Sequence, residues 1–230
     1  MEPQPPSPPQ PSSAPRAPTA PALLVPLPRP LRGGCTRARI GSAEVLLETV
    51  RGGHSLLWSN GRATRRYALG LHAAGQLTLQ LRAPKLPLHV VPREIVTLVS
   101  GGRLAGYVVV SLVPTVCWHS PGGSTEALLE LQPDDLAAEW DETEGHLFTA
   151  ASPLCVRFPV PTGEPRAVVP LRLRNDSAAV CTPGFVPLTI HDDELTPMRG
   201  SIVVPPRRLR WTGERFATGS GPRAALGEAS

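Results

Sequence analysis

The chain has 230 residues, of which 41% are hydrophobic and 18% charged, a composition typical of a folded protein rather than a disordered one. Its net charge is +4, but its 22 arginines and single lysine (Lys85) are scattered among acidic residues. Because affinity for nucleic acid depends on cations gathered on one surface, the composition argues against nucleic-acid binding.

The first 34 residues are dominated by proline, serine and alanine, and 12 of the 29 prolines fall within positions 1–30. Proline locks φ and lacks a backbone donor, so residues 1–34 are predicted to be a disordered tail that samples extended, polyproline-like conformations. Spacings such as Pro3–Pro6 would suit a docking peptide for an aromatic-lined groove, but a solvated spacer is the favoured interpretation.

Beyond the tail, the hydrophobic pattern changes to a period of two, which is typical of β-strands. Short runs rich in β-forming residues cover 44–50 and 93–100, and clear polar–apolar alternation covers Gln76–Arg82 and Val169–Arg174. The pair Asn60-Gly61 stands between two such runs and is a strong hairpin signal.

The longest apolar stretch runs from Leu104 to Trp118 without a charge and is interrupted by Pro114. It is shorter than the roughly 20 residues that a membrane-spanning helix needs, so no transmembrane span is predicted. Its β-branched part, Tyr107–Val113, is predicted to be a buried central strand. The preceding segment Gly101–Gly106 has the glycine spacing of a phosphate loop, but the lysine and hydroxyl residue that must follow are missing.

Prolines recur at short intervals after residue 80 and exclude long helices, since an interior proline costs about 3 kcal/mol. The segment Pro133–Trp140, with acidic residues that can cap its start, is the one helix candidate. Short strands separated by turn signals predict an all-β fold, a β-sandwich or open barrel of short antiparallel strands with at most one short helix. We expect this domain to cover residues 35–216, followed by a disordered C-terminal tail at 217–230.

Four cysteines lie far apart and form no CxxC pair: Cys35, Cys117, Cys155 and Cys181. The start of the chain has neither the basic nor the apolar region of a secretory signal, which predicts a cytoplasmic protein with buried, reduced thiols. The closest cysteine–histidine grouping is Cys117-Trp118-His119, and only tertiary coincidence could bring His146, His191 or the other cysteines to it as zinc ligands. We therefore predict no metal and no cofactor.

Two acidic segments resemble parts of catalytic sites. The first is favoured as a solvated helix face, because it lacks the alternating ligands and the central glycine of a calcium loop; its acids are Asp134, Asp135, Glu139, Asp141, Glu142 and Glu144. The second, His191–Leu195, places an imidazole beside three acids, but the chain has no GxSxG nucleophile motif, and a polar loop is favoured. No catalytic residue is assigned from the sequence.

From about residue 86 to 215 the order of features resembles an uncharacterised, mainly archaeal family, some relatives of which are associated with small-conductance mechanosensitive channels. Two segments carry the resemblance. Val91–Val96 leads into the long apolar strand, and Val169–Ser177 is a strand that runs into an asparagine-centred turn. The resemblance implies an all-β accessory domain.

We expect a non-enzymatic binding or assembly module that docks onto a protein partner, with a membrane-associated protein among the candidates. The alternative is a hydrolase whose cleft is built from His119, His191 and the acidic residues near Asp134. The two hypotheses differ in a testable way. The hydrolase needs these side chains together in one concave pocket, whereas a binding module leaves them scattered.

Overall fold

The computed structural model describes residues 23–31, 34–51, 53–69, 75–85, 87–141, 145–198 and 200–218. Over these ranges the regular elements are strands, β1 to β18, and one 3-10 helix, η1 (Asp192–Glu194). The all-β prediction with at most one short helix is confirmed. No helix formed by the described residues is long and apolar enough to cross a membrane.

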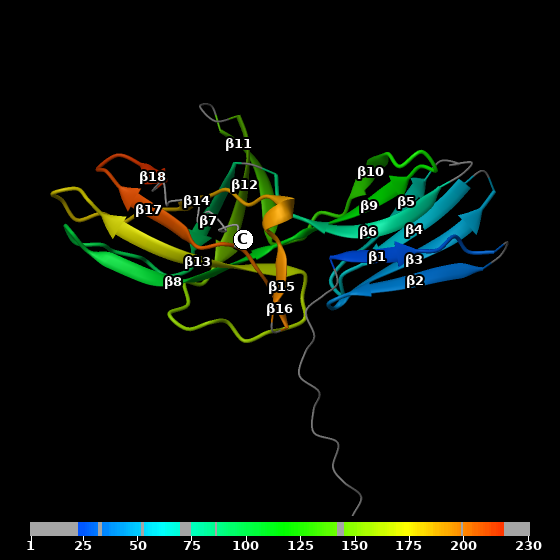
Figure 1. The fold of residues 1–230 in the computed structure, drawn as a ribbon, viewed down its shortest axis with the longest axis horizontal. Coiled ribbons are helices and arrows are strands. Elements are labelled where there is room, and N and C mark those ends of the chain that lie inside the picture. Colours follow the sequence, from blue (N-terminus) through cyan, green and yellow to red (C-terminus); the bar gives the residue numbers. More distant parts are fainter. Residues whose placement is uncertain are drawn as a thin grey trace, which may run out of the picture.

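The strands form two halves, which lie on the right and on the left of Figure 1. The half on the right, here called the N-terminal sandwich, consists of two four-stranded sheets. One sheet contains, in order, β2 (Cys35–Ile40), β3 (Ala43–Val50), β4 (Gly53–Ser59) and β5 (Thr64–Leu69). The other contains β1 (Leu24–Leu27), β6 (Gln76–Arg82), β9 (Val113–His119) and β10 (Thr125–Glu130).

The half on the left, here called the C-terminal lobe, also has two sheets. The smaller one contains, in order, β11 (Leu136–Asp141), β12 (Gly145–Ser152), β7 (Leu88–Pro92) and β14 (Val186–Leu188). The larger one is built around β13 and contains β8 (Arg103–Ser111), β13 (Arg166–Asn175), β15 (Thr196–Met198), β16 (Ser201–Val203), β17 (Arg207–Trp211) and β18 (Phe216–Thr218). Most pairs in the molecule are antiparallel, but β7 pairs parallel with β12, and β13 pairs parallel with β16 and β17.

The chain passes between the two halves from β6 to β7, from β8 to β9 and from β10 to β11. The passage from β8 to β9 takes a single residue, Leu112, which is fully buried and donates its N–H to the carbonyl oxygen of Pro165 at 2.8 Å. The predicted strand over Tyr107–Val113 is therefore the end of one strand and the start of another. Within β8, Val108 and Val110 are fully buried, whereas Val109 between them is half-buried.

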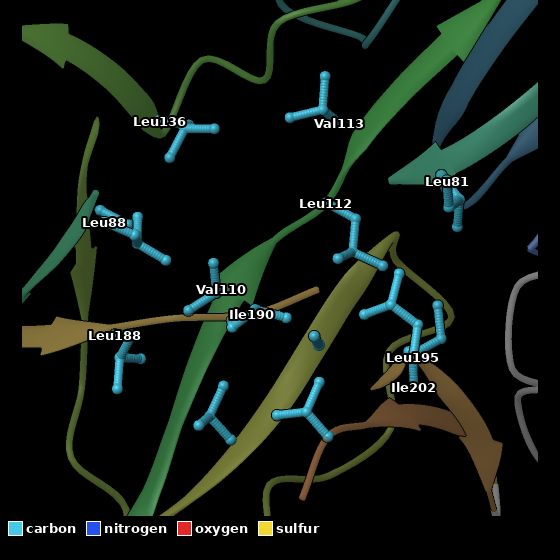
Figure 2. Close-up of a cluster of buried hydrophobic side chains, with 14 of the residues drawn as sticks. Leu81, Leu88, Val110, Leu112, Val113, Leu136, Leu188, Ile190, Leu195 and Ile202 are labelled. Carbon is cyan, nitrogen blue, oxygen red and sulfur yellow. The ribbon is translucent and has the colours of Figure 1, made fainter. Parts of the chain in front are cut away.

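One cluster of buried side chains continues through both halves. Figure 2 shows its part in the C-terminal lobe, where Val110 of β8 lies among Leu88 of β7, Leu188 of β14 and Ile190. Leu112 and Val113 lie beside this group, toward Leu81 of β6 in the N-terminal sandwich. Because apolar burial is the main stabilising term in folding, the two halves share one source of stability at this junction.

Several local predictions are confirmed. The alternation in 76–82 produces β6, whose Leu77, Leu79 and Leu81 are buried, and the alternation in 169–174 lies within β13. Asn60 begins the turn between β4 and β5, and its Oδ1 accepts the backbone N–H groups of Arg62 and Ala63 at 3.0 and 2.8 Å. Asparagine and glycine favour this turn because they tolerate its backbone angles, and Gly61 has φ 82°.

The predicted boundaries of the tails need correction. Residues 1–22 lie outside the described residues, but β1, within the predicted 1–34 tail, pairs antiparallel with β6. Leu27 is buried and the proline at 26 sits on an edge strand, where a missing N–H costs no ladder bond. At the other end β18 extends to Thr218, past the predicted boundary at 216, and 219–230 lie outside the described residues.

The helix predicted over Pro133–Trp140 is wrong, because β11 occupies this segment and pairs with β12 over six residues. A helix of two turns gains few hydrogen bonds for the dihedral angles it fixes, whereas the hairpin pairs the backbone and buries Leu136. The strand predicted over 93–100 is also wrong. Within it Leu98 forms an isolated bridge with Cys181, and the strand in this region is β7.

Asn175 holds three loop carbonyl groups together from the end of β13. Its side chain is fully buried, and Nδ2 donates to the carbonyl oxygens of Leu98, Val99 and Ala179 at 2.9, 3.2 and 2.7 Å. Its Oδ1 accepts the N–H and the hydroxyl of Ser177. An asparagine that the sequence marks as a turn residue therefore also reinforces the isolated bridge between Leu98 and Cys181.

We expect Leu27→Ala to lower the free energy of unfolding by about 2–5 kcal/mol, because it leaves a cavity in the core under β1. Leu24→Ala on the same strand is the matched control, since Leu24 is 49% exposed and its truncation should change stability by less than about 0.5 kcal/mol. Urea unfolding measures both. Equal effects of the two substitutions would show that β1 is not packed onto the sandwich.

We expect Asn175→Ala to cost about 3 kcal/mol of stability, because it removes the five hydrogen bonds of a fully buried side chain. The control is Arg172→Ala, an exposed position on the same strand, with an expected change below about 0.5 kcal/mol. Thermal unfolding followed by circular dichroism compares them. A midpoint for Asn175→Ala within the error of the wild type would contradict the bridging role.

Candidate functional site

A cleft of about 320 Å³ lies where the N-terminal sandwich meets the C-terminal lobe. The apolar side of its lining includes Trp58, Leu112 and Pro114. The polar side comes from five separate turns and strand ends of both halves: Ser42, Asn60, Arg62, Ser111, Asp134, Asp135, Glu164 and Arg166. It therefore joins segments that are more than a hundred residues apart in the sequence.

Asp134 and Asp135 connect the base of β11 to both halves. Asp134 accepts a hydrogen bond from Asn60 Nδ2 at 2.7 Å, and its other oxygen lies 3.6 Å from the guanidinium of Arg65. Asp135 Oδ2 accepts the hydroxyl of Ser111 at 2.8 Å and lies 3.4 Å from Arg166 Nη2. Adjacent acids thus bind the N-terminal sandwich and the C-terminal lobe, respectively.

Glu164 closes the opposite side of the cleft. Its carboxylate accepts the backbone N–H of Ser42 at 3.1 and 3.2 Å and the Ser42 hydroxyl at 3.0 Å. Gly41 allows this approach, because a Cβ at that position would lie 2.9 Å from the Glu164 Cα, and its φ is 59°. Asp134 and Glu164 therefore form hydrogen bonds or ion pairs between the two halves, whereas Asp135 is bonded within the C-terminal lobe.

The β11–β12 hairpin rises from this clamped base and projects from the molecule (Figure 1). On β11, Leu136 is buried, but every residue from Ala137 to Trp140 is exposed. The Trp140 side chain is 69% exposed and makes an edge-to-face contact with His146 of β12, with 4.8 Å between ring centroids. Glu139, on the other face, accepts the hydroxyl of Thr149 at 3.0 Å.

The hairpin is also the acidic part of a basic chain. Residues 131–156 contain six acids and no lysine or arginine, whereas the whole chain has a net charge of +4. Two of these acids, Asp134 and Asp135, are neutralised at the base as described above. Glu139 has no ion pair among the described residues.

The structure places the two histidines of the hydrolase hypothesis away from the cleft. Pro114 lines the cleft, and His119 lies five residues further along the extended strand β9, about 16 Å away at roughly 3.3 Å per residue. His119 is held there between the hydroxyls of Thr78 (2.7 Å) and Thr125 (2.9 Å).

His191 is exposed at the start of η1, where its backbone N–H donates to the Glu194 carboxylate at 2.9 Å. Its neighbour Asp192 lines a smaller cavity of about 160 Å³ together with Arg82 and Lys85. Neither cavity has a histidine in its described lining, so the structure does not bring His119, His191 and Asp134 together.

The described residues contain no group of three histidine, cysteine or acidic side chains that could hold a metal ion. Cys117 lies beside Arg82, with 3.4 Å between Sγ and Nη2, and not among metal-ligating groups. The four cysteines are free thiols. Cys117 and Cys181 are buried as predicted and Cys155 is half-buried, but Cys35 on the edge strand β2 is exposed, which corrects the prediction for that residue.

Comparisons of the chain with protein-family models, with curated proteins and with solved structures give no match. The resemblance carried by Val91–Val96 and Val169–Ser177 therefore stays an expectation from the sequence. The candidate site is a polar cleft whose hydrogen bonds hold the base of an exposed, acidic hairpin in place.

We expect thiol titration of the native protein to give a fast phase from Cys35 and a slower one from the half-buried Cys155, with Cys117 and Cys181 reacting only on unfolding. Burial raises the pKa of both buried thiols, although Arg82 opposes this at Cys117, so little thiolate is present at neutral pH. Cys35→Ser should remove the fast phase in a reaction followed with a chromogenic disulfide. A fast phase that survives this substitution would contradict the assignment.

Proposed function

We propose that the chain is a non-enzymatic binding module for a protein partner, and that the β11–β12 hairpin is its contact surface. The observation that carries the proposal is the exposure of Trp140 on an edge strand that projects from the body. Tryptophan is among the residues that contribute most to binding energy at protein interfaces, because its large apolar ring is removed from water there.

The anchoring of the hairpin base supports this function. Asp134 and Asp135 are tied to Asn60 and Ser111, so the start of β11 is positioned before any partner arrives. A binding element that is already ordered loses less conformational entropy on association than a flexible loop does. In this proposal the cleft has a structural role: its hydrogen bonds set the orientation of the hairpin.

We include a membrane-associated protein among the candidate partners. The reason is that two segments resemble a family with relatives associated with mechanosensitive channels. Nothing in the contact surface requires the partner to be in a membrane. The hairpin presents an apolar ring, a carboxylate and a free strand edge, which are features that other proteins recognise.

The proposal predicts that a photo-crosslinking amino acid at Ala137, an exposed position of β11, yields a discrete protein adduct in an extract of the producing cells. The same amino acid at Val160 is the control, since Val160 is 83% exposed but lies in the loop between β12 and β13. Adding Trp140→Ala to the Ala137 variant should remove the adduct, with mass spectrometry and gel mobility as readouts.

Excess full-length protein without the crosslinking amino acid should reduce the yield of the adduct by competing for the partner, whereas its Trp140→Ala variant should not. Both variants are first checked for an unchanged melting temperature, since Trp140 makes few contacts in the folded state. Absence of an adduct at Ala137, or equal adducts at Ala137 and Val160, would refute the hairpin as the contact surface.

A further inference from the structure

The open edge of β11 exposes a defined set of backbone groups. Phe148 of β12 donates its N–H to the carbonyl oxygen of Pro87, so its backbone groups point toward β7 and away from β11. Ala138 is directly opposite Phe148. In an antiparallel ladder, opposite residues either bond to each other or both point outward, so the N–H and C=O of Ala138 point to the open edge.

The same holds for Trp140, two residues further along the strand, because the ladder repeats every second residue. The N–H and C=O groups of Ala138 and Trp140 have no backbone partner among the described residues. At the other end of the strand, the edge is closed: Leu136 donates to Pro133 and its carbonyl oxygen accepts from Gln132 Nε2. The open edge is thus short and located beside the exposed ring.

Three other edge strands in the molecule, β10, β14 and β15, carry features that discourage pairing. The edge strand β10 contains a register shift between Ala127 and Leu129, and β15 and β14 contain Pro197 and Pro187. Bulges and prolines interrupt the donor row that a second strand would need. The described part of β11 has neither, and it pairs with β12 in unbroken register. The edge strands β2 and β5 also lack both features, but each carries two arginines and no acid.

The side chains next to this edge differ between the two faces. Ala138 and Trp140 share one face, on which small and aromatic apolar groups lie side by side. Glu139 lies on the opposite face, in a segment with six acids and no basic residue. A strand added here would place every second side chain against the Trp140 ring and the intervening ones against the Glu139 carboxylate.

We propose, resting on the function proposed above, that the partner is recognised through an extended segment that alternates basic and apolar residues and adds to β11 as a further strand. The apolar side chains cover Trp140 and Ala138, and the basic ones pair with Glu139. Backbone hydrogen bonds supply the affinity that does not depend on sequence, whereas charge and apolar contact select the segment.

The test uses the full-length protein and a fluorescent peptide that alternates arginine and valine, with fluorescence anisotropy as the readout. We expect saturable binding that weakens as salt is raised, because the ion pairs at the exposed hairpin are screened. Glu139→Lys and Trp140→Ala should each weaken binding about tenfold or more. Glu126→Lys, which reverses an exposed acid on the interrupted edge strand β10, is the matched control and should leave binding unchanged.

Two further peptides test strand addition and charge selection separately. A peptide of the same sequence with every backbone amide N-methylated keeps its charge but has no N–H to donate to the ladder, and it should not bind. A peptide that alternates glutamate and valine should not bind either. Equal binding of the methylated peptide would overturn strand addition, and equal binding of the acidic peptide would overturn charge selection.

Failure of the strand-addition inference can be distinguished from failure of the proposed binding function. If the arginine–valine peptide does not bind while the Ala137 crosslink to a protein persists, the strand-addition inference fails and the hairpin remains a contact surface. If the protein elutes as a dimer that Trp140→Ala dissociates, the edge is occupied by a second copy and the inference is also overturned. Loss of both peptide binding and crosslink would refute the two proposals together.

Discussion

The passage of the chain from β8 into β9 through one buried residue governs the arrangement of the molecule. Leu112 has no exposed surface, and its N–H is bonded to Pro165 of the segment that precedes β13. Since no loop separates the two strands, rotation of one half against the other would have to distort the backbone at Leu112 and expose the shared core. The cleft beside Leu112 lies where the N-terminal sandwich and the C-terminal lobe meet, at the passage from β8 to β9.

The acidic residues next to this junction have a structural role that places the exposed hairpin. Asp134 binds Asn60 and Asp135 binds Ser111, so the start of β11 is connected to both halves within two consecutive residues. The carboxylates of Asp134 and Asp135 are bonded to side chains of the protein itself, although the cleft that they line is polar. The groups left for an interaction with another molecule are therefore further along the hairpin, at Glu139 and Trp140.

Sequence patterns predicted the elements whose stability is local or periodic. The alternation in Gln76–Arg82 corresponds to β6, and Asn60-Gly61 makes the β4–β5 turn that its backbone preferences indicate. The pattern failed at Pro133–Trp140, where residues with good helix propensity form β11, because pairing with β12 outweighs weak intrinsic preferences over so few residues. It also failed at Leu24–Leu27, since a proline-rich composition does not prevent pairing on an edge strand.

By itself, the sequence determined an all-β chain with frequent turns, buried apolar faces and no long helix, because proline spacing and period-two alternation act on the backbone locally. Only the tertiary structure decided which residues meet. Ser42 meets Glu164 and Asn60 meets Asp134 across long stretches of chain, and no spacing rule relates them. The tertiary structure also decided that β11 is an edge strand and that Trp140 is exposed, since an open edge depends on the order of strands in the sheet, which the strand patterns do not specify.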